Sequence, residues 1–149
     1  MKKKVYYEHD IHTRTSIGLE YEKYLHQSQS KYQNIEIIYS GKYGNAMYLD
    51  GCFMLSEMNQ DYYHDKCISL VPSSVDNILI VGGGDYAIAS KLATQKGIKS
   101  IRIVEIDVEV INLSKKYCPK HFTLSKKNIS KISLTVKDGM RFIRKNTER

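Results

Sequence analysis

The sequence predicts an α/β protein, with a Rossmann-like parallel sheet preceded by a small β-hairpin module. Short apolar runs alternate with helical patterns in the second part of the chain, and a glycine-rich turn follows the first of these runs. Ten of the twelve tyrosines lie at or before Tyr63, which gives the first part the composition of a β-rich unit. We therefore expect a β-rich module over residues 1–58 and a Rossmann-like nucleoside-binding domain over residues 59–149.

The first part contains a hairpin pattern. Residues 34–39 are rich in β-branched side chains and predict a strand, and residues 46–50 predict the returning strand, closed by Gly51. Turn-forming residues connect the two. Because a lone hairpin is marginal in water, we expect it to pack on other structure.

The second part alternates strands and helices. Apolar spacing from Gln60 to Val71 predicts a first helix that ends at Pro72. The later elements are expected as a strand at 78–81, a helix to about residue 95, a strand at 100–106, a helix at 108–117, a strand at 132–136 and a helix beginning near Asp138. The first strand is continuously apolar, which predicts burial on both faces. This order is that of a doubly wound sheet.

Composition and charge exclude several protein classes. The 149 residues are 42% hydrophobic and 26% charged, proportions unlike those of disordered, collagen-like or coiled-coil chains. No apolar run approaches the roughly 20 residues that cross a bilayer, and the basic start lacks a secretory signal. The net charge of +7 comes from dispersed lysines without a recognition pattern, so we expect no nucleic-acid partner. Three scattered cysteines predict a reducing, cytoplasmic compartment and no metal site.

A nucleoside-binding pattern follows the first strand of the sheet. Gly82 and Gly84 fit the first two positions of a dinucleotide fingerprint, and Ala87 takes the third. Glu105 ends the second strand about 20 residues later, where a carboxylate accepts hydrogen bonds from ribose hydroxyls. Asp138 ends the third strand, so three features converge on one crevice. The alternative is that Glu105 and Asp138 only cap helices.

Asp85 distinguishes between two classes of ligand. A carboxylate beside the glycine turn repels a pyrophosphate and attracts a cation such as a sulfonium or an amine. The sequence therefore favours an S-adenosyl ligand over NAD.

These motifs together resemble those of the spermidine synthases, the polyamine aminopropyltransferases. The motifs that carry the resemblance are, in chain order, Ser30-Lys31-Tyr32-Gln33, Tyr48-Leu49-Asp50-Gly51, Tyr63-His64-Asp65, Gly82-Gly83-Gly84-Asp85, Val104-Glu105-Ile106-Asp107 and Asp138-Gly139. The set extends from about residue 30 to the end of the chain.

The resemblance implies an activity and roles for particular residues. The family transfers an aminopropyl group from decarboxylated S-adenosylmethionine, a co-substrate, to putrescine or a similar amine, and it releases methylthioadenosine. By resemblance, the aminopropyl donor would be bound by Gln33, His64, Gly82, Gly84, Asp85, Glu105, Asp138 and Gly139, and the amine by Tyr63 and Asp85. No cofactor or metal is implied, and a homo-oligomer is expected.

The sequence also departs from the family pattern. Tyr86 and Ala87 follow Asp85, where the family usually has two glycines. Met54, Asn59 and Gln60 occupy the region in which the family usually has a ligand-contacting glutamine followed by an Asp-Glu pair. The family's catalytic acid lies on a fourth strand, which would come after Arg149, so we assign no catalytic residue. We expect either a fragment truncated after the third strand or a partner chain that completes the sheet. A non-catalytic nucleoside-binding module and an S-adenosylmethionine-dependent methyltransferase remain as alternatives.

Overall fold

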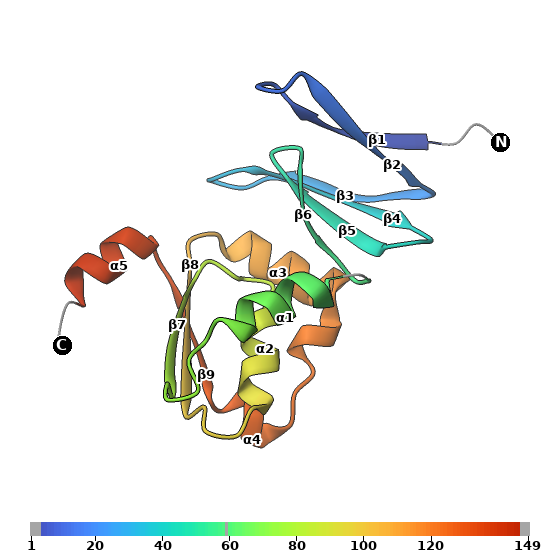
Figure 1. Ribbon diagram of the computed structural model, residues 1–149. Coiled ribbons are helices and arrows are strands. Elements are labelled where there is room, and N and C mark those ends of the chain that lie inside the picture. The colour runs from blue at the N-terminus through green and yellow to red at the C-terminus, as the bar shows by residue number, and fades with distance from the viewer. Residues whose placement is uncertain (1–3, 59, 147–149) are drawn as a thin grey trace. The chain divides into compact units, whose positions relative to one another are not determined.

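The chain divides into two compact units, Met1–Gln60 and Asp61–Arg149. The computed structural model describes residues 4–58 and 60–146 (Figure 1). We call the two units the N-terminal unit and the C-terminal unit, and each is described by itself.

The N-terminal unit is built from antiparallel strands. They are β1 (Lys4–Asp10), β2 (Thr15–Tyr21), β3 (Lys23–Gln29), β4 (Asn34–Ser40), β5 (Gly44–Leu49) and β6 (Cys52–Ser56). Strands β1 and β2 pair as a hairpin, and the other four form a sheet in the order β3-β4-β5-β6. The predicted hairpin is thus present as β4 and β5, within a unit that is larger than a single hairpin.

Tyrosines join the β1–β2 hairpin to the four-stranded sheet. The ring of Tyr6 packs on that of Tyr48, with 4.1 Å between centroids, over a core that contains Ile38. The hydroxyls of Tyr6 and Tyr24 both donate to the carboxylate of Glu36. Burial, together with these bonds, raises the pKa of both phenols, so they stay protonated donors.

The C-terminal unit contains the predicted parallel sheet. Its elements are α1 (Asp61–Ser69), β7 (Asn77–Val81), α2 (Ala87–Thr94), β8 (Ser100–Glu105), α3 (Val108–Tyr117), η1 (Pro119–Phe122), α4 (Lys126–Ile129), β9 (Ile132–Val136) and α5 (Gly139–Lys145). The strand order is β7-β8-β9, and both pairings are parallel. The predicted Rossmann-like fold class is therefore confirmed. Among the described residues, no helix is long and apolar enough to cross a membrane.

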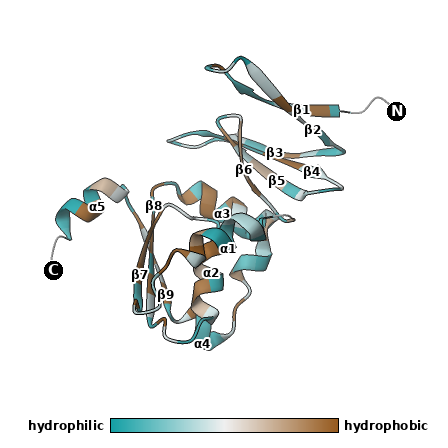
Figure 2. Ribbon diagram, viewed as in Figure 1, coloured by the Kyte–Doolittle hydropathy of each residue, from teal (hydrophilic) through white to brown (hydrophobic). Residues whose placement is uncertain are grey.

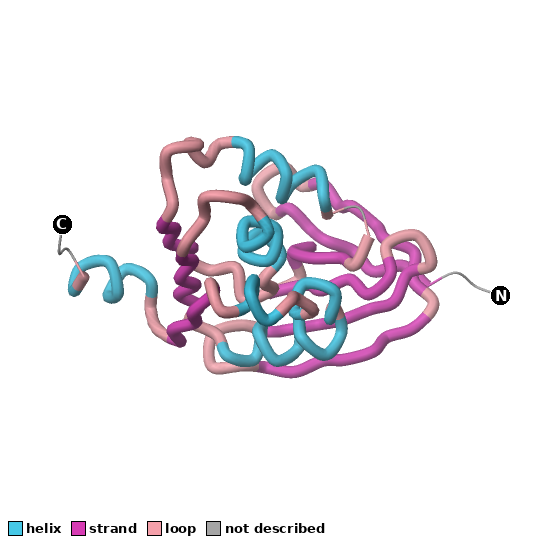
Figure 3. Tube along the Cα trace, turned by 90° about the horizontal axis from the view of Figure 1, so that it is seen from below, coloured by secondary structure: helices cyan, strands magenta, loops and turns pink. Residues whose placement is uncertain are grey.

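Helices cover the two faces of this sheet unequally. Helices α1 to α4 lie on one side and α5 on the other (Figures 1 and 3). The covered face holds the core, where Ile101 and Ile103 of β8 pack against Ala89 and Leu92 of α2. Hydrophobic residues accordingly dominate β7, β8 and the inner side of α2 (Figure 2).

The prediction that β7 is buried on both faces is wrong. Ile78 and Ile80 pack against the core, whereas the alternate residues Leu79 and Val81 are 44% and 54% exposed. Strand β7 is at an edge of the described sheet, and its second face has little helical cover. A continuous apolar run therefore shows that the side chains on both faces of the strand are apolar, but not that both faces are buried.

Two short helices were not predicted. The 3-10 helix η1 begins at Pro119, and α4 begins after Ser125, whose hydroxyl accepts the N–H of Asn128. The segment between α3 and β9 is mostly polar and has no helical period, so neither helix could be predicted from it.

Replacing Ile103 by alanine should lower the free energy of unfolding by about 2–5 kcal/mol, because the side chain is fully buried on the covered face. The matched control is Leu79→Ala on the other face, where partial exposure predicts a cost below about 1 kcal/mol. Urea denaturation measures both. Equal costs would contradict the unequal cover of the two faces.

Candidate active site

The predicted donor-binding residues of the C-terminal unit gather where its three parallel strands end. The glycine turn follows β7, Glu105 ends β8, and Asp138 lies between β9 and α5. Because the carboxyl ends of parallel strands meet at one edge, this is the crevice in which open α/β sheets bind ligands.

The glycine turn lies directly against Glu105. A Cβ on Gly84 would come within 3.0 Å of the Glu105 side chain and of Ile111, so only glycine fits there without a shift. Gly82 has a left-handed φ of 81°, and its N–H donates to the carbonyl of Val104 at 2.8 Å. The two glycines thus serve packing and backbone conformation in the chain itself.

Backbone N–H groups hold the carboxylate of Glu105 in place. One oxygen accepts the N–H of Gly84 at 3.1 Å, and the other accepts those of Ile106 at 2.7 Å and Asp107 at 3.0 Å. Glu105 does not cap α3, because Asp107 does so by accepting the N–H of Glu109. A carboxylate has about four lone-pair sites, so this one retains capacity for a ribose hydroxyl.

Asp138 and Gly139 begin helix α5. The Asp138 carboxylate accepts the N–H of Arg141 at 2.8 Å, so it caps this helix. A Cβ on Gly139 would lie 2.4 Å from Val81, which shows that the start of α5 lies close against the end of β7. This contact brings Gly139 to the glycine turn.

Asp85 connects the turn to helix α1. One of its oxygens accepts the N–H of Ala87 at the start of α2. The other lies 3.9 Å from Nε2 of His64, which α1 contributes. Two of the predicted donor-binding side chains, far apart in sequence, are therefore neighbours.

Two buried histidines lie at this place, although the sequence indicated only one. His64 is 4% exposed and His121 of η1 is 5% exposed, and their ring centroids are 6.0 Å apart. Burial lowers the pKa of both below the ordinary 6.5, against the opposing effect of Asp85. His121 was missed because a single histidine outside any motif gives no signal in a sequence.

Ion pairs fix α1 on α2 and so help to place His64. Lys91 of α2 lies 2.7 Å from a carboxylate oxygen of Asp61 and 2.6 Å from one of Asp65. Both carboxylates are largely exposed, so the stabilisation is modest. The geometric effect is to hold two turns of α1 against the neighbouring helix.

The remaining predicted residues are placed differently. Tyr63 precedes His64 on α1 and is 65% exposed, with a hydrogen bond to Cys67 that raises the pKa of its hydroxyl. Gln33 belongs to the N-terminal unit, where its backbone closes a turn with Ser30 between β3 and β4. The structure of the C-terminal unit therefore brings together the predicted set without Gln33.

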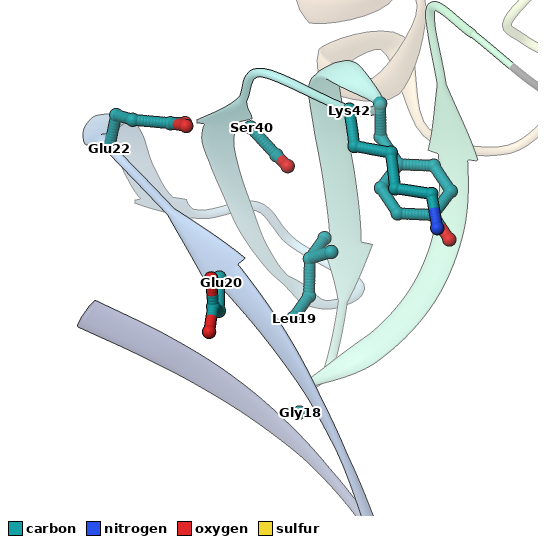
Figure 4. A pocket seen from close by; sticks show the side chains of 7 residues that line it. Gly18, Leu19, Glu20, Glu22, Ser40 and Lys42 are labelled. Atoms are coloured by element: carbon teal, nitrogen blue, oxygen red, sulfur yellow. The ribbon is translucent and has the colours of Figure 1, made fainter. Parts of the chain in front are cut away.

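The N-terminal unit has a hollow of about 330 Å³ that contains none of the predicted residues (Figure 4). Glu20, Glu22, Ser40 and Lys42 line it, so its charges are mixed. The Glu22 carboxylate already accepts the N–H of Gly41 at 2.9 Å, which gives it a structural role. In residues 4–58 and 60–146, no group of His, Cys, Asp and Glu side chains is arranged to hold a metal ion.

Comparison with known proteins identifies the family of the chain. The family model described as the spermine/spermidine synthase domain matches residues 54–149, and the spermidine synthase tetramerisation domain matches residues 6–57. The chain belongs to the spermidine synthase family.

Relatives with curated names share the sequence of both matched regions. Two named polyamine aminopropyltransferase are 35% identical (Prochlorococcus marinus strain AS9601) and 33% identical (Clostridium botulinum strain Eklund 17B), over 93% and 92% of this chain. The chain spans about half the length of these relatives, 50% and 48%.

Solved spermidine synthases share the fold. The Thermotoga maritima enzyme superposes with a TM-score of 0.83 at 21% identity, covering 95% of this chain and 50% of that one. A spermidine synthase in complex with the transition-state analogue AdoDATO gives 0.82 at 22% identity, covering 95% and 48%.

The histidine pair makes stability depend on pH in this family member. The two histidines bind protons at lower pH in the folded protein than in the unfolded chain. Their contribution to the free energy of unfolding is therefore complete above about pH 6.5 and is lost progressively on acidification. The slope contributed is at most about 1.4 kcal/mol per pH unit for each histidine.

Urea denaturation between about pH 5 and 7.5 measures this slope. We expect His121→Phe to flatten it, and Leu79→Ala, which removes no titratable group, to leave it unchanged. A parent protein whose stability rises on acidification would contradict the assignment.

Proposed function

We propose that this chain forms the nucleoside-binding part of an aminopropyltransferase that acts on decarboxylated S-adenosylmethionine and a diamine such as putrescine. The observation that carries the proposal is the contact of Asp85 with His64 beside a glycine turn that is bonded to Glu105. Family membership and the names of the relatives support the same activity.

Each group has a role that follows from its chemistry. Glu105 would accept the ribose hydroxyls, Asp138 and Gly139 would contact the adenine, and Gly82 and Gly84 would let the nucleoside approach the backbone. Asp85 and His64 would lie near the sulfonium and its aminopropyl chain.

The acceptor amine would lie near Asp85 and Tyr63. A carboxylate and an aromatic ring attract a cationic ligand, and Asp85 supplies the charge. In the proposed reaction the neutral amine nitrogen attacks the aminopropyl carbon that is bonded to sulfur. The carbon–sulfur bond breaks with its electrons going to sulfur, which yields methylthioadenosine, and the amine loses a proton to a base. We assign that base to no described residue.

We also infer a homo-oligomer in the cytoplasm. The match of residues 6–57 to a tetramerisation domain supports self-association. The three cysteines are free, which fits a reducing compartment.

The proposal predicts selective binding of the decarboxylated donor. S-adenosylmethionine carries a carboxylate that Asp85 would repel, so we expect it to bind at least about tenfold more weakly than decarboxylated S-adenosylmethionine. Isothermal titration of the chain with each compound measures the ratio. Asp85→Asn should reduce the preference.

Equal or reversed affinities would favour a methyltransferase and reject the proposal. Release of methylthioadenosine from the donor and putrescine would show turnover in addition. Tight binding of the donor without that release would support a non-catalytic nucleoside-binding module.

A further inference from the structure

Helix η1 contributes to the site although none of the recognised motifs includes it. Its residue His121 is buried beside His64, with the two imidazole rings almost perpendicular at 81°. His64 in turn lies 3.9 Å from Asp85. Three polar side chains from α1, the glycine turn and η1 thus form one cluster, which we call the His–Asp–His cluster.

Two aromatic rings hold η1 against the glycine turn. The ring of Tyr86 lies on that of Phe122, with 4.6 Å between centroids. Tyr86 has a left-handed φ of 63°, a conformation that costs a bulky residue about 1–3 kcal/mol. Glycine would avoid this cost, so the contact of the Tyr86 ring with Phe122 offsets part of the strain. The ring is directed to η1, and it therefore determines where His121 lies.

The His–Asp–His cluster has unused polar capacity. Nδ1 of His64 is buried and has no hydrogen-bond partner among the described residues. A buried polar atom of this kind costs about 1–3 kcal/mol when left unpaired, and with no hydrogen bond at Nδ1 the orientation of the ring depends on its packing contacts. An alkylammonium group offers three donors, which suit the Asp85 carboxylate and the neighbouring Nε2 atom of a neutral His64.

The charges around the cluster favour a cation. Asp85 acts electrostatically on both rings. Asp61 and Asp65 add negative charge near His64, and Lys91, which these two carboxylates share, opposes it. Lys120 and Asp61 have smaller, opposing electrostatic effects on His121. Low pKa values keep both rings uncharged near neutral pH, so neither one repels an ammonium group.

We propose that His121 is a positioning residue for the amine: packed edge-on against His64, it orients that ring and Asp85 to bind a primary alkylammonium. This deepens the proposed function and rests on it. His121 acts through His64 and does not contact the reacting atoms.

The test measures two ligands separately on the full chain. Methylthioadenosine reports on the nucleoside site, and putrescine added in its presence reports on the amine site. We expect His121→Ala to weaken putrescine about tenfold and to change the affinity for methylthioadenosine less than twofold. His121→Phe, which keeps an edge-on ring, should restore most of the putrescine affinity, and His12→Ala is the matched control.

A spectroscopic measurement separates positioning from simple destabilisation. In the parent, NMR signals of the His64 ring should shift on addition of putrescine, and in His121→Ala they should shift little. If His121→Ala does not fold, Tyr86→Gly is the second variant, because it relieves the strained φ while releasing η1. It should weaken putrescine in the same way, and Tyr86→Phe should not.

Three results would overturn the inference. They are putrescine affinity unchanged in both His121→Ala and Tyr86→Gly, equal loss of both ligands, and a parent that binds methylthioadenosine but not putrescine. The affinity for methylthioadenosine, measured without putrescine, tests the nucleoside site of the proposed function separately. A parent that does not bind methylthioadenosine would reject the proposed function itself.

Discussion

The site depends on the way in which the backbone surrounds one carboxylate. Glu105 is buried at the end of β8, and a buried charge is tolerated only when hydrogen bonds replace its water. The N–H groups of Gly84, Ile106 and Asp107 supply those bonds, each worth about 1.5–3 kcal/mol when the acceptor is charged. The same bonds tie the glycine turn to the second strand and set the position from which Asp85 projects.

Around this fixed centre, the C-terminal unit adds polar groups from elements on the helical side of the sheet. Helix α1 brings His64 and η1 brings His121, and both rings stay uncharged next to Asp85. The negative charge of the site is therefore carried by Glu105 and Asp85, whose carboxylates accept hydrogen bonds from backbone N–H groups. This combination suits a ligand with a cationic sulfur and a cationic amine, and it would be unfavourable for a pyrophosphate.

The sequence predicted the parts of the fold whose local pattern is strong. The apolar runs of β7, β8 and β9 and the helix α3 between Asp107 and Pro119 were predicted within a residue or so. Strands β1 to β3 were not predicted. All three are mostly exposed, and β1 and β3 lack alternation, whereas the alternating Ile17, Leu19 and Tyr21 of β2 were overlooked. The family resemblance implied that His64 and Asp85 contact the same ligand, and the structure places them 3.9 Å apart. The place of His121 depends on the stacking of Tyr86 on Phe122, a tertiary contact that no local pattern reveals.

The strand orders of the two units imply different folding rates. In the order β3-β4-β5-β6 every strand pairs with its neighbour in sequence, and Ser40 lies opposite Gly44 across a short turn. In the parallel sheet Asn77 lies opposite Ser100, so a whole helix must be accommodated before one pairing closes. Since chain segments of low sequence separation meet sooner, the tyrosine-rich sheet should acquire its structure first, both in refolding and during synthesis from the N-terminus. The candidate site at the ends of the parallel strands would then be the slower element to assemble.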